Sequence, residues 1–295
     1  MTHTINKSTC KECDLCITIC PSGILARNDK GEAVFLPDKT SICVKCGHCM
    51  AVCSKRSISI EGLSYEENFP PLPSNSIHYD EFKDFLMTRR SIRHFIDRPV
   101  SREMLEKIVD AIALAPFGVA PDNVEITLVA ERKLIQQALP EISKMYLQLG
   151  KMLKFAPMRW LFQRVMPKDT GNTLINFLLP HIQKGLYDYT KEDDISRNAP
   201  AMILFHAAKG AGERNSDAMI YTTYAFLAAH SLGLGATVIG LIGPGINRSK
   251  KLKELYQIPS DNEVIQTVIL GYPKINFKKA IVRPRKKVKI IPPPL

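Results

Sequence analysis

The sequence predicts an α+β protein in two parts, and three observations support this prediction. All eight cysteines lie in the first 53 of the 295 residues. A proline-rich stretch follows at residues 64–79, and beyond it short apolar runs typical of strands are mixed with longer segments typical of helices. Length alone favours about two domains, and strands mixed with helices favour an α+β or α/β core. We therefore expect a small domain at residues 1–63, a linker at 64–79 and a larger domain at 80–295.

The overall composition is that of a globular protein, with 45% hydrophobic and 23% charged residues. No apolar run approaches the roughly 18 residues that a membrane helix needs, and the first residues lack the apolar core of a signal peptide. We therefore expect no membrane span and a cytoplasmic location, where thiols stay reduced. The formal net charge of +11 would suit a nucleic acid, but the chain shows no nucleic-acid-binding module. We expect the excess positive charge to balance bound anionic cofactors instead.

The cysteines form two identical patterns. Each pattern reads C-x2-C-x2-C-x3-C, and the second repeats the first at an offset of 33 residues. The members are Cys10, Cys13, Cys16 and Cys20, then Cys43, Cys46, Cys49 and Cys53. Three thiolates at this spacing wrap one [4Fe-4S] cube, while the fourth cysteine of the run reaches the other cube. The pattern therefore predicts two clusters. Their ligand sets are Cys10, Cys13, Cys16 and Cys53 for one, and Cys20, Cys43, Cys46 and Cys49 for the other.

Zinc is the alternative for this head, but a zinc ribbon uses two C-x2-C pairs and leaves the third cysteine of each run without a role. The head resembles the bacterial two-cluster ferredoxin domain over residues 5–62. It departs at one point, because Pro21 follows the first quartet whereas Ser54 follows the second. Apolar neighbours of the cysteines are expected to shield the clusters from water, which helps to set their reduction potentials. These neighbours are Ile17, Ile19, Ile24, Leu25, Val44, Ile58 and Ile60.

Polar residues and three prolines make residues 64–79 a semi-rigid linker. After it, Asp80 is the expected N-cap of a short helix that ends with two arginines. Ser101 is the expected N-cap of a second helix, which Pro116 stops.

A third helix is expected from Asp217 to Ser231, closed by Gly233. Four apolar runs are predicted as strands, at residues 124–130, 201–207, 236–242 and 264–270. Residues 133–195 are predicted as a helical excursion that is a lid, part of an oligomer interface, or an amphipathic filler of the core. His206 and His230 lie in apolar elements and are predicted as core histidines.

The stretch RRSIRHF, residues 89–95, places three arginines and a serine at the expected end of a helix. A guanidinium fork matches a phosphate group bidentately, and a serine hydroxyl can add one hydrogen bond. Taken alone, such a run is more often a solvated helix end.

Three segments occur in a fixed order: RRSIRHF, GLGATVIG at residues 233–240, and GYPK at 271–274 followed by further basic residues. Together they resemble the nitroreductase family of FMN enzymes across residues 80–290. With the cysteine head in front, the chain resembles ferredoxin–nitroreductase fusions of anaerobes. The resemblance implies a nitroreductase-like α+β domain, with a central mixed sheet flanked by helices, after the ferredoxin-like domain. It also implies a homodimer with FMN at the subunit interface.

The resemblance assigns FMN contacts to named positions. They are Arg89, Arg90, Ser91, Arg93, Pro116, Val238, Ile239, Gly240, Arg283 and Arg285. One of the last two arginines is expected to supply a further phosphate contact, and a backbone N–H near Gly240 is expected to face flavin N5. The family often reads APSGGNSQPW where this chain reads APFGVAPDNV, residues 115–124. Ala120 and Asp122 therefore replace amide side chains that usually meet the flavin, and Phe117 is free to shape the substrate pocket.

The implied activity is that of an FMN-dependent nitroreductase-type oxidoreductase. Ferredoxin or another low-potential donor would reduce the clusters, the clusters would reduce FMN, and FMN would reduce an organic acceptor such as a nitroaromatic or a quinone. Because the flavin is the redox reagent, no side chain need act as a catalytic acid or nucleophile. The alternative is a redox carrier or sensor without small-molecule turnover. A Rossmann site is not expected, because GLGATVIG follows a helix rather than a strand.

Overall fold

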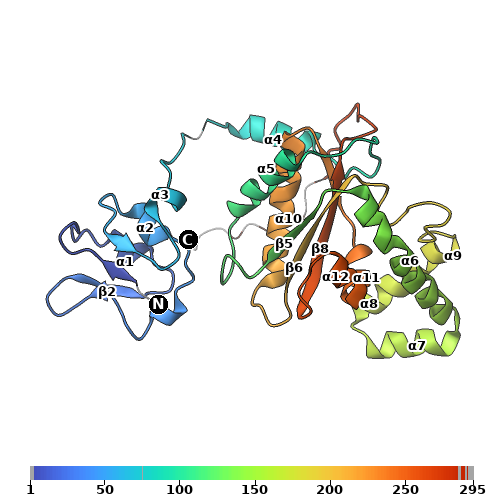
Figure 1. The fold of residues 1–295 in the computed structure, drawn as a ribbon, viewed down its shortest axis with the longest axis horizontal. Helices are drawn as coiled ribbons and strands as arrows, with labels where there is room; N and C mark the ends of the chain where they lie inside the picture. Colours follow the sequence, from blue (N-terminus) through green and yellow to red (C-terminus); the bar gives the residue numbers. More distant parts are fainter. Residues whose placement is uncertain (1–2, 75, 285–286, 290, 292–295) are drawn as a thin grey trace. The chain divides into compact units, whose positions relative to one another are not determined.

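The computed structural model describes residues 3–74, 76–284, 287–289 and 291 and separates into two compact units. The first unit comprises Met1–Ser76 with Phe117–Asn123, and the second comprises Ile77–Pro116 with Val124–Leu295. Figure 1 shows both. Within the described ranges, none of the helices combines the length and apolar content that a membrane crossing requires.

The first unit is built on a structural repeat that follows the cysteine repeat. Helix α1 (Leu15–Ile19) and helix α2 (His48–Val52) each contain the third cysteine of a run, and the fourth cysteine is the C-cap of the helix. Two antiparallel ribbons complete the unit. They are β1 (Thr4–Ile5) with β4 (Ile58–Ser59), and β2 (Leu25–Arg27) with β3 (Ala33–Phe35). A short 3-10 helix, η1 (Thr40–Ile42), precedes the second run.

The segment predicted as a linker is partly helical. Helix α3 (Tyr65–Asn68) begins after Ser64, whose side chain accepts a hydrogen bond from the Glu66 N–H. Tyr65 and Phe69 pack against the core of the first unit, formed by buried Met50, Ile58 and Ile60. The start of residues 64–79 is thus part of the first unit, because a serine cap and two aromatic residues outweigh the prolines that follow.

The second unit is centred on a four-stranded sheet in the order β5-β6-β8-β7. Its strands are β5 (Glu125–Val129), β6 (Ala201–Ala208), β7 (Gly235–Val238) and β8 (Asn262–Gly271), and neighbouring strands pair antiparallel. A single parallel bridge joins Ser91 to Ala236 at the β7 edge. Strand β6 is buried on both faces along nearly its whole length, because helices cover both sides of the sheet.

Helices α5 (Arg102–Ala113) and α10 (Arg214–Ser231) lie on one face of the sheet, and α6 (Arg132–Lys154), α11 (Ile242–Asn247) and α12 (Lys250–Leu255) lie on the other (Figure 1). Side chains of β6 alternate accordingly: Phe205 meets Tyr221 of α10, whereas Met202 and Leu204 join the core with α6. This is the alternation expected for a strand.

The helical excursion predicted for residues 133–195 is confirmed as helical, and its parts differ in burial. Helix α6 contributes Ile135, Leu139 and Ile142 to the core. Beyond it come α7 (Ala156–Val165), α8 (Lys168–Asn172), the π-helix η2 (Thr173–Leu178) and α9 (Leu179–Gln183). No residue of α7 is buried. The core-filling interpretation therefore applies to α6, and it does not apply to α7.

Three details differ from the predictions. The N-cap of α4 (Tyr79–Thr88) is His78, in a capping box with Glu81, and not Asp80, which lies in the first turn. The strand expected at 236–242 ends at Val238, because α11 begins at Ile242. The helix expected from Asp217 begins three residues earlier. By contrast, the Ser101 cap is confirmed, since its side chain accepts a hydrogen bond from the Met104 N–H.

Candidate functional site

The eight cysteines of the first unit surround two separate hollows. One hollow is lined by Cys20, Cys43, Cys46 and Cys49. The other is lined by Cys10, Cys13, Cys16 and Cys53. Each hollow thus combines three cysteines of one sequence run with the last cysteine of the other run. All eight thiols are free, and this division is the one that the pattern predicts for two clusters. Ligation itself stays a prediction.

The backbone before each helix turns in the same way in both runs. Glu12 (φ 53) and Asp14 (φ 58) of the first run correspond to Lys45 (φ 50) and Gly47 (φ 73) of the second. Left-handed residues at alternate positions curl a loop so that its N–H groups converge, which creates a concavity for an anion. A [4Fe-4S] cube with four thiolates is anionic, so the loops and the donor set both fit such a group. Among the described residues, no three Cys, His, Asp or Glu side chains are grouped as for a single metal ion.

The cysteines differ in how readily they ionise. Burial raises the pKa of Cys49 to about 11 and also raises the pKa of Cys16. Cys53 is different: burial acts to raise its pKa, but hydrogen bonds led by the Ser57 N–H, and including the Tyr65 hydroxyl, lower it overall. The Ser57 N–H donates to Cys53 Sγ at 3.3 Å. Because metal ligands must be thiolates, loading of these hollows would release protons.

The apolar walls agree only in part with the predicted set. Ile24 and Ile60 line the first hollow and Ile58 the second, and all three are buried. Val44 also lines the first hollow, whereas Ile19 is 45% exposed and lines neither. Sequence reasoning placed Ile19 in the wall because it neighbours Cys20, but it lies on the outer side of α1.

Helix α3 supplies two aromatic contacts that the sequence analysis missed. The Tyr65 hydroxyl is buried with no hydrogen-bond partner of good geometry among the described residues, yet it lies close enough to Cys53 to lower the pKa of that thiol. Burial and the Cys53 charge raise the pKa of Tyr65 to about 12, so this hydroxyl stays protonated. Phe69 packs against Gly47, where an added Cβ would lie 3.1 Å from its ring. Composition alone marked this stretch as linker, which hid both contacts.

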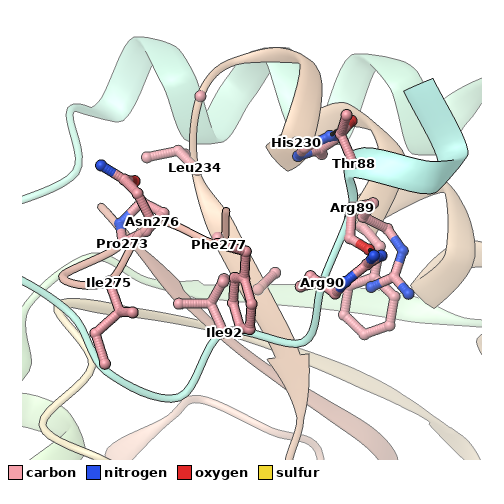
Figure 2. Close-up of a pocket in the computed structure, with 14 residues that line it drawn as sticks. Thr88, Arg89, Arg90, Ile92, His230, Leu234, Pro273, Ile275, Asn276 and Phe277 are labelled. Carbon is pink, nitrogen blue, oxygen red and sulfur yellow. Dashed lines mark hydrogen bonds between the residues drawn. The ribbon is translucent and has the colours of Figure 1, made fainter. Parts of the chain in front are cut away.

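In the second unit, a cavity of about 260 Å³ lies between the end of α4, α10 and the turn before β7. Arg89 and Arg90 line it, and Figure 2 shows their side chains on one side of the space, across from Asn276. An adjoining hollow of about 300 Å³ is also lined by both arginines, together with Arg283 and Lys83. The fold therefore brings Arg283, from the C-terminal segment, to three basic residues of residues 83–90. We call Arg89, Arg90 and Arg283 the arginine cluster.

The charge of this arginine cluster is not balanced within the part of the chain that the structure describes. None of the ion pairs found there involves Arg89, Arg90 or Arg283. The Nε of Arg90 is buried with no hydrogen-bond partner in that part. Burial lowers the pKa of Arg89, and the charges of Arg90 and Arg283 lower it further. The Arg90 guanidinium is half-buried and donates to Arg89 O at 2.7 Å, but it has no acidic partner in that part of the chain. Neighbouring cations without a counter-charge repel one another, so this cluster is suited to a phosphate-like dianion.

The other predicted FMN contacts line neither of these two hollows. Ser91 and Arg93 are exposed, on the extended segment that Ser91 joins to β7. Pro116 and Gly240 are exposed as well. Val238 is half-buried and Ile239 is buried. Arg285 lies outside the described residues.

The first residues of β7 pack closely against the extended segment that contains Ile92. A Cβ on Gly235 would lie 2.3 Å from the Ile92 side chain, so only glycine allows this approach. The Ile92 N–H donates to Ala236 O at 3.2 Å. The Ile239 N–H donates to Thr267 O at 2.9 Å, so this backbone donor is already used within the sheet.

His206 is a core histidine as predicted, but His230 is not. His206 is buried and lies within hydrogen-bond distance of Thr127 and Asn262. His230 is half-buried in the cavity wall, 2.8 Å from Thr88 Oγ1. Burial and then the charge of Arg89 lower the pKa of His230. The apolar sequence of α10 led to the prediction of a core position. In the structure, α4 contacts the C-terminal end of α10 through Phe85 and His230, and His230 lines the cavity beside this contact.

Comparisons with known proteins agree with this arrangement. The model of the nitroreductase family matches residues 86–272, more than half of the chain. The model of the 4Fe-4S dicluster domain matches residues 9–58. The chain therefore belongs to the nitroreductase family and carries a 4Fe-4S dicluster domain ahead of the nitroreductase domain. It is an oxidoreductase of the nitroreductase type, and the predicted fusion and α+β fold are confirmed.

Two curated relatives are named "Putative NADH dehydrogenase/NAD(P)H nitroreductase". The one from Archaeoglobus fulgidus is 28% identical over 195 residues, which are 66% of this chain and 87% of the relative. The one from Methanothermobacter thermautotrophicus is 27% identical over 191 residues, which are 65% of this chain and 76% of the relative.

Solved structures share the fold of the second unit. A nitroreductase with bound FMN from Desulfitobacterium hafniense aligns with a TM-score of 0.52 at 19% identity, covering 71% of this chain and 97% of that chain. An FMN-dependent nitroreductase from Clostridium difficile R20291 aligns with a TM-score of 0.51 at 19% identity, covering 72% of this chain and all of that chain (100%).

Proposed function

We propose that the protein is an iron–sulfur flavoprotein in which two [4Fe-4S] clusters pass electrons to FMN for the reduction of an organic acceptor, such as a nitroaromatic or a quinone. One observation carries the proposal: two four-cysteine hollows occur in the same chain as an unbalanced arginine cluster. The cluster lies at the RRSIRHF motif, and the solved neighbours named above are described as binding or depending on FMN.

The first unit would hold the clusters through the interlocked cysteine sets. The hollow of Cys20 would take one cube and the hollow of Cys53 the other. The residues around them exclude water and donate hydrogen bonds to sulfur, which tunes the reduction potential. The Ser57 N–H and the Tyr65 hydroxyl are the groups with this role at Cys53.

The second unit would hold FMN, which supplies two-electron chemistry when bound. Arg89, Arg90 and Arg283 would bind its phosphate group, since they share one hollow and have no acidic partner there. Ser91 and Arg93 would add contacts from the same extended segment. Residues Val238–Gly240 would lie along the flavin ring, with the Gly240 N–H positioned as a donor. No side chain is required as an acid or nucleophile.

A low-potential donor such as ferredoxin would reduce the clusters, and a homodimer would complete the flavin site. Apolar side chains exposed beside the arginine cluster support a subunit interface there: Tyr79, Phe82 and Leu86 of α4, with Ile281 of the C-terminal segment. The free thiols are consistent with a reducing compartment such as the cytoplasm.

The test is anaerobic purification followed by assays of iron, sulfide and released FMN. We expect about eight irons and one FMN per chain, bleaching of the spectrum by dithionite, and recovery on addition of a nitroaromatic or a quinone. Full cofactors without reoxidation by any acceptor would instead favour a carrier or sensor. Zinc without flavin would refute both halves of the proposal.

A further inference from the structure

Helix α7 has an apolar stripe that the second unit covers only in part: Met158 and Phe162 are half-buried, whereas Leu161 and Val165 are exposed. Met158, Leu161, Phe162 and Val165 are spaced i, i+3, i+4 and i+7, which places them on one helical face. In a surface helix of a globular protein such a face points into the core. Here no residue of α7 is buried, and Leu161 is 46% and Val165 74% exposed.

The residues around this stripe are aromatic, apolar or basic. Phe155, between α6 and α7, is 63% exposed and Trp160 is 57% exposed. From residue 142 to residue 168 the chain has no acidic residue and six basic ones. They are Lys144, Lys151, Lys154, Arg159, Arg164 and Lys168. The guanidinium of Arg164 lies over the Trp160 ring at 4.8 Å. We call the exposed side chains of residues 151–168 the α7 surface.

We propose that the α7 surface docks on an anionic lipid bilayer and makes this protein a peripheral membrane protein. An interfacial helix combines exposed apolar and aromatic side chains with Lys and Arg side chains. The exposed Leu161, Val165 and Trp160 would enter the headgroup region, while the five cations of the α7 surface would meet anionic lipids. This inference concerns a surface and does not depend on the proposed redox activity.

The structure favours a bilayer over a second copy of the chain as the occupant. Residues 151–168 carry five basic and no acidic side chains, so anionic lipid headgroups complement their charge, whereas a second copy of this chain, with a formal net charge of +11, is itself basic. A different apolar surface, beside Arg89 and Arg90, already suits a partner subunit. Helix α7 packs chiefly on α6 and α8, and Figure 1 shows it at the end of α6 on the sheet face opposite α10. The two surfaces are therefore separate.

Helix α6 links the α7 surface to the proposed flavin site. The Tyr146 hydroxyl of α6 donates to Leu241 O at 3.0 Å, directly after the segment Val238–Gly240. A Cβ on Gly245 of α11 would lie 2.7 Å from Ile142 of α6, so these helices are in close contact. A protein attached through α7 would meet acceptors that dissolve in the bilayer, such as quinones.

Trp160 is the only tryptophan of the chain, so its fluorescence reports on this surface alone. The full-length holoprotein is mixed with phosphatidylcholine vesicles that contain or lack phosphatidylglycerol. We expect co-sedimentation and a blue shift of the tryptophan emission only with the anionic vesicles, both reversed by high salt. Absence of binding to the anionic vesicles would overturn the proposal. So would a blue shift that appears with single-stranded DNA or with self-association instead of vesicles.

Charge variants test the same surface. The double variant Arg159→Gln/Arg164→Gln should bind anionic vesicles roughly 30-fold more weakly, from about one decade or less per cation near the surface. The matched control is Lys133→Gln/Lys251→Gln, which removes two exposed cations from α6 and α12 and should bind like the parent protein. Iron and FMN contents equal to those of the parent would show that both variants fold. Equal weakening in both variants would contradict a specific role for α7.

Discussion

The two proposed cofactor sites of this chain are built in opposite ways. In the first unit, all eight cysteines belong to two short runs. The two runs share the same backbone conformation, including left-handed residues at matching positions. In the second unit, Arg89, Phe226, Gly235 and Phe277 come from four separate parts of the chain before they line one cavity. A site built from local repeats depends on spacing, whereas a dispersed site depends on the packing of the whole unit.

The largest expected effect comes from replacing cysteines of the two runs by serine, singly and in pairs. If the clusters are interlocked, Cys53→Ser should remove the cluster of Cys10, Cys13 and Cys16, and iron should fall from about eight to about four per chain. Adding Cys13→Ser to Cys53→Ser should then cost no further iron, whereas adding Cys46→Ser should remove the rest. Iron assays and EPR of the reduced protein measure this. If adding Cys13→Ser removes the remaining iron and adding Cys46→Ser costs none, each run holds its own cluster instead.

The dispersed site is tested by Arg89→Gln, which removes one charged donor from the arginine cluster. A hydrogen bond to a charged group is worth about 1.5–3 kcal/mol, so FMN should bind roughly 10- to 150-fold more weakly. The measurement is a fluorescence titration of the deflavinated protein with FMN. Arg102→Gln is the control, because Arg102 is an exposed arginine that pairs with Glu106 on α5. An unchanged dissociation constant for Arg89→Gln would remove this residue from the phosphate site.

A smaller effect, on stability, is expected from the contact between Ile92 and Gly235, the first residue of β7. Gly235→Ala would drive a Cβ to 2.3 Å from the Ile92 side chain, and overpacking of this kind costs about 1–3 kcal/mol. Gly240→Ala, in the same GLGATVIG segment, has no neighbour within 4 Å and should leave stability unchanged. Thermal unfolding of the two variants measures the difference, with a loss of roughly 2–4 °C per kcal/mol for Gly235→Ala. Shortening Ile92 to Ala in the Gly235→Ala background should restore part of the loss.

The smallest expected effect concerns the aromatic contact at the first unit. A protonated hydroxyl close to a ligand sulfur stabilises the reduced, more negative cluster, and the Tyr65 hydroxyl lies near enough to Cys53 to lower the pKa of that thiol. Tyr65→Phe should therefore lower the midpoint potential of the cluster held by Cys53 and leave the other potential unchanged. A spectroelectrochemical titration followed by EPR resolves the two. Tyr189→Phe, in the second unit, is the control and should change neither potential. A shift of both clusters on Tyr65→Phe would indicate a general loosening of the first unit.

How much could be predicted differs between the two regions. The cysteine pattern was sufficient to divide the eight cysteines into the two sets that line the two hollows, because at most three residues separate consecutive cysteines within a run. The arginine motif was found, but the pattern could not tell that Arg89, Arg90 and Arg283 share a hollow while Ser91 and Arg93 stay exposed. The N-cap at Ser101 was predictable from a local signal, whereas the cap at His78 was missed because histidine is not a typical capping residue.

The sequence by itself determined the features from which the proposed chemistry follows: two repeated cysteine runs, an arginine motif that resembles a family motif, and an α+β order of elements. These features depend on the spacing of residues close together in the sequence, so they can be recognised without knowledge of tertiary contacts. Only the tertiary structure decided that α3 belongs to the first unit, that His230 forms a cavity wall and that Ile92 requires a glycine at position 235. It also decided that the apolar stripe of α7 stays partly exposed while that of α6 is buried. Both helices are amphipathic in sequence, but whether an apolar face is buried depends on which other elements pack against it.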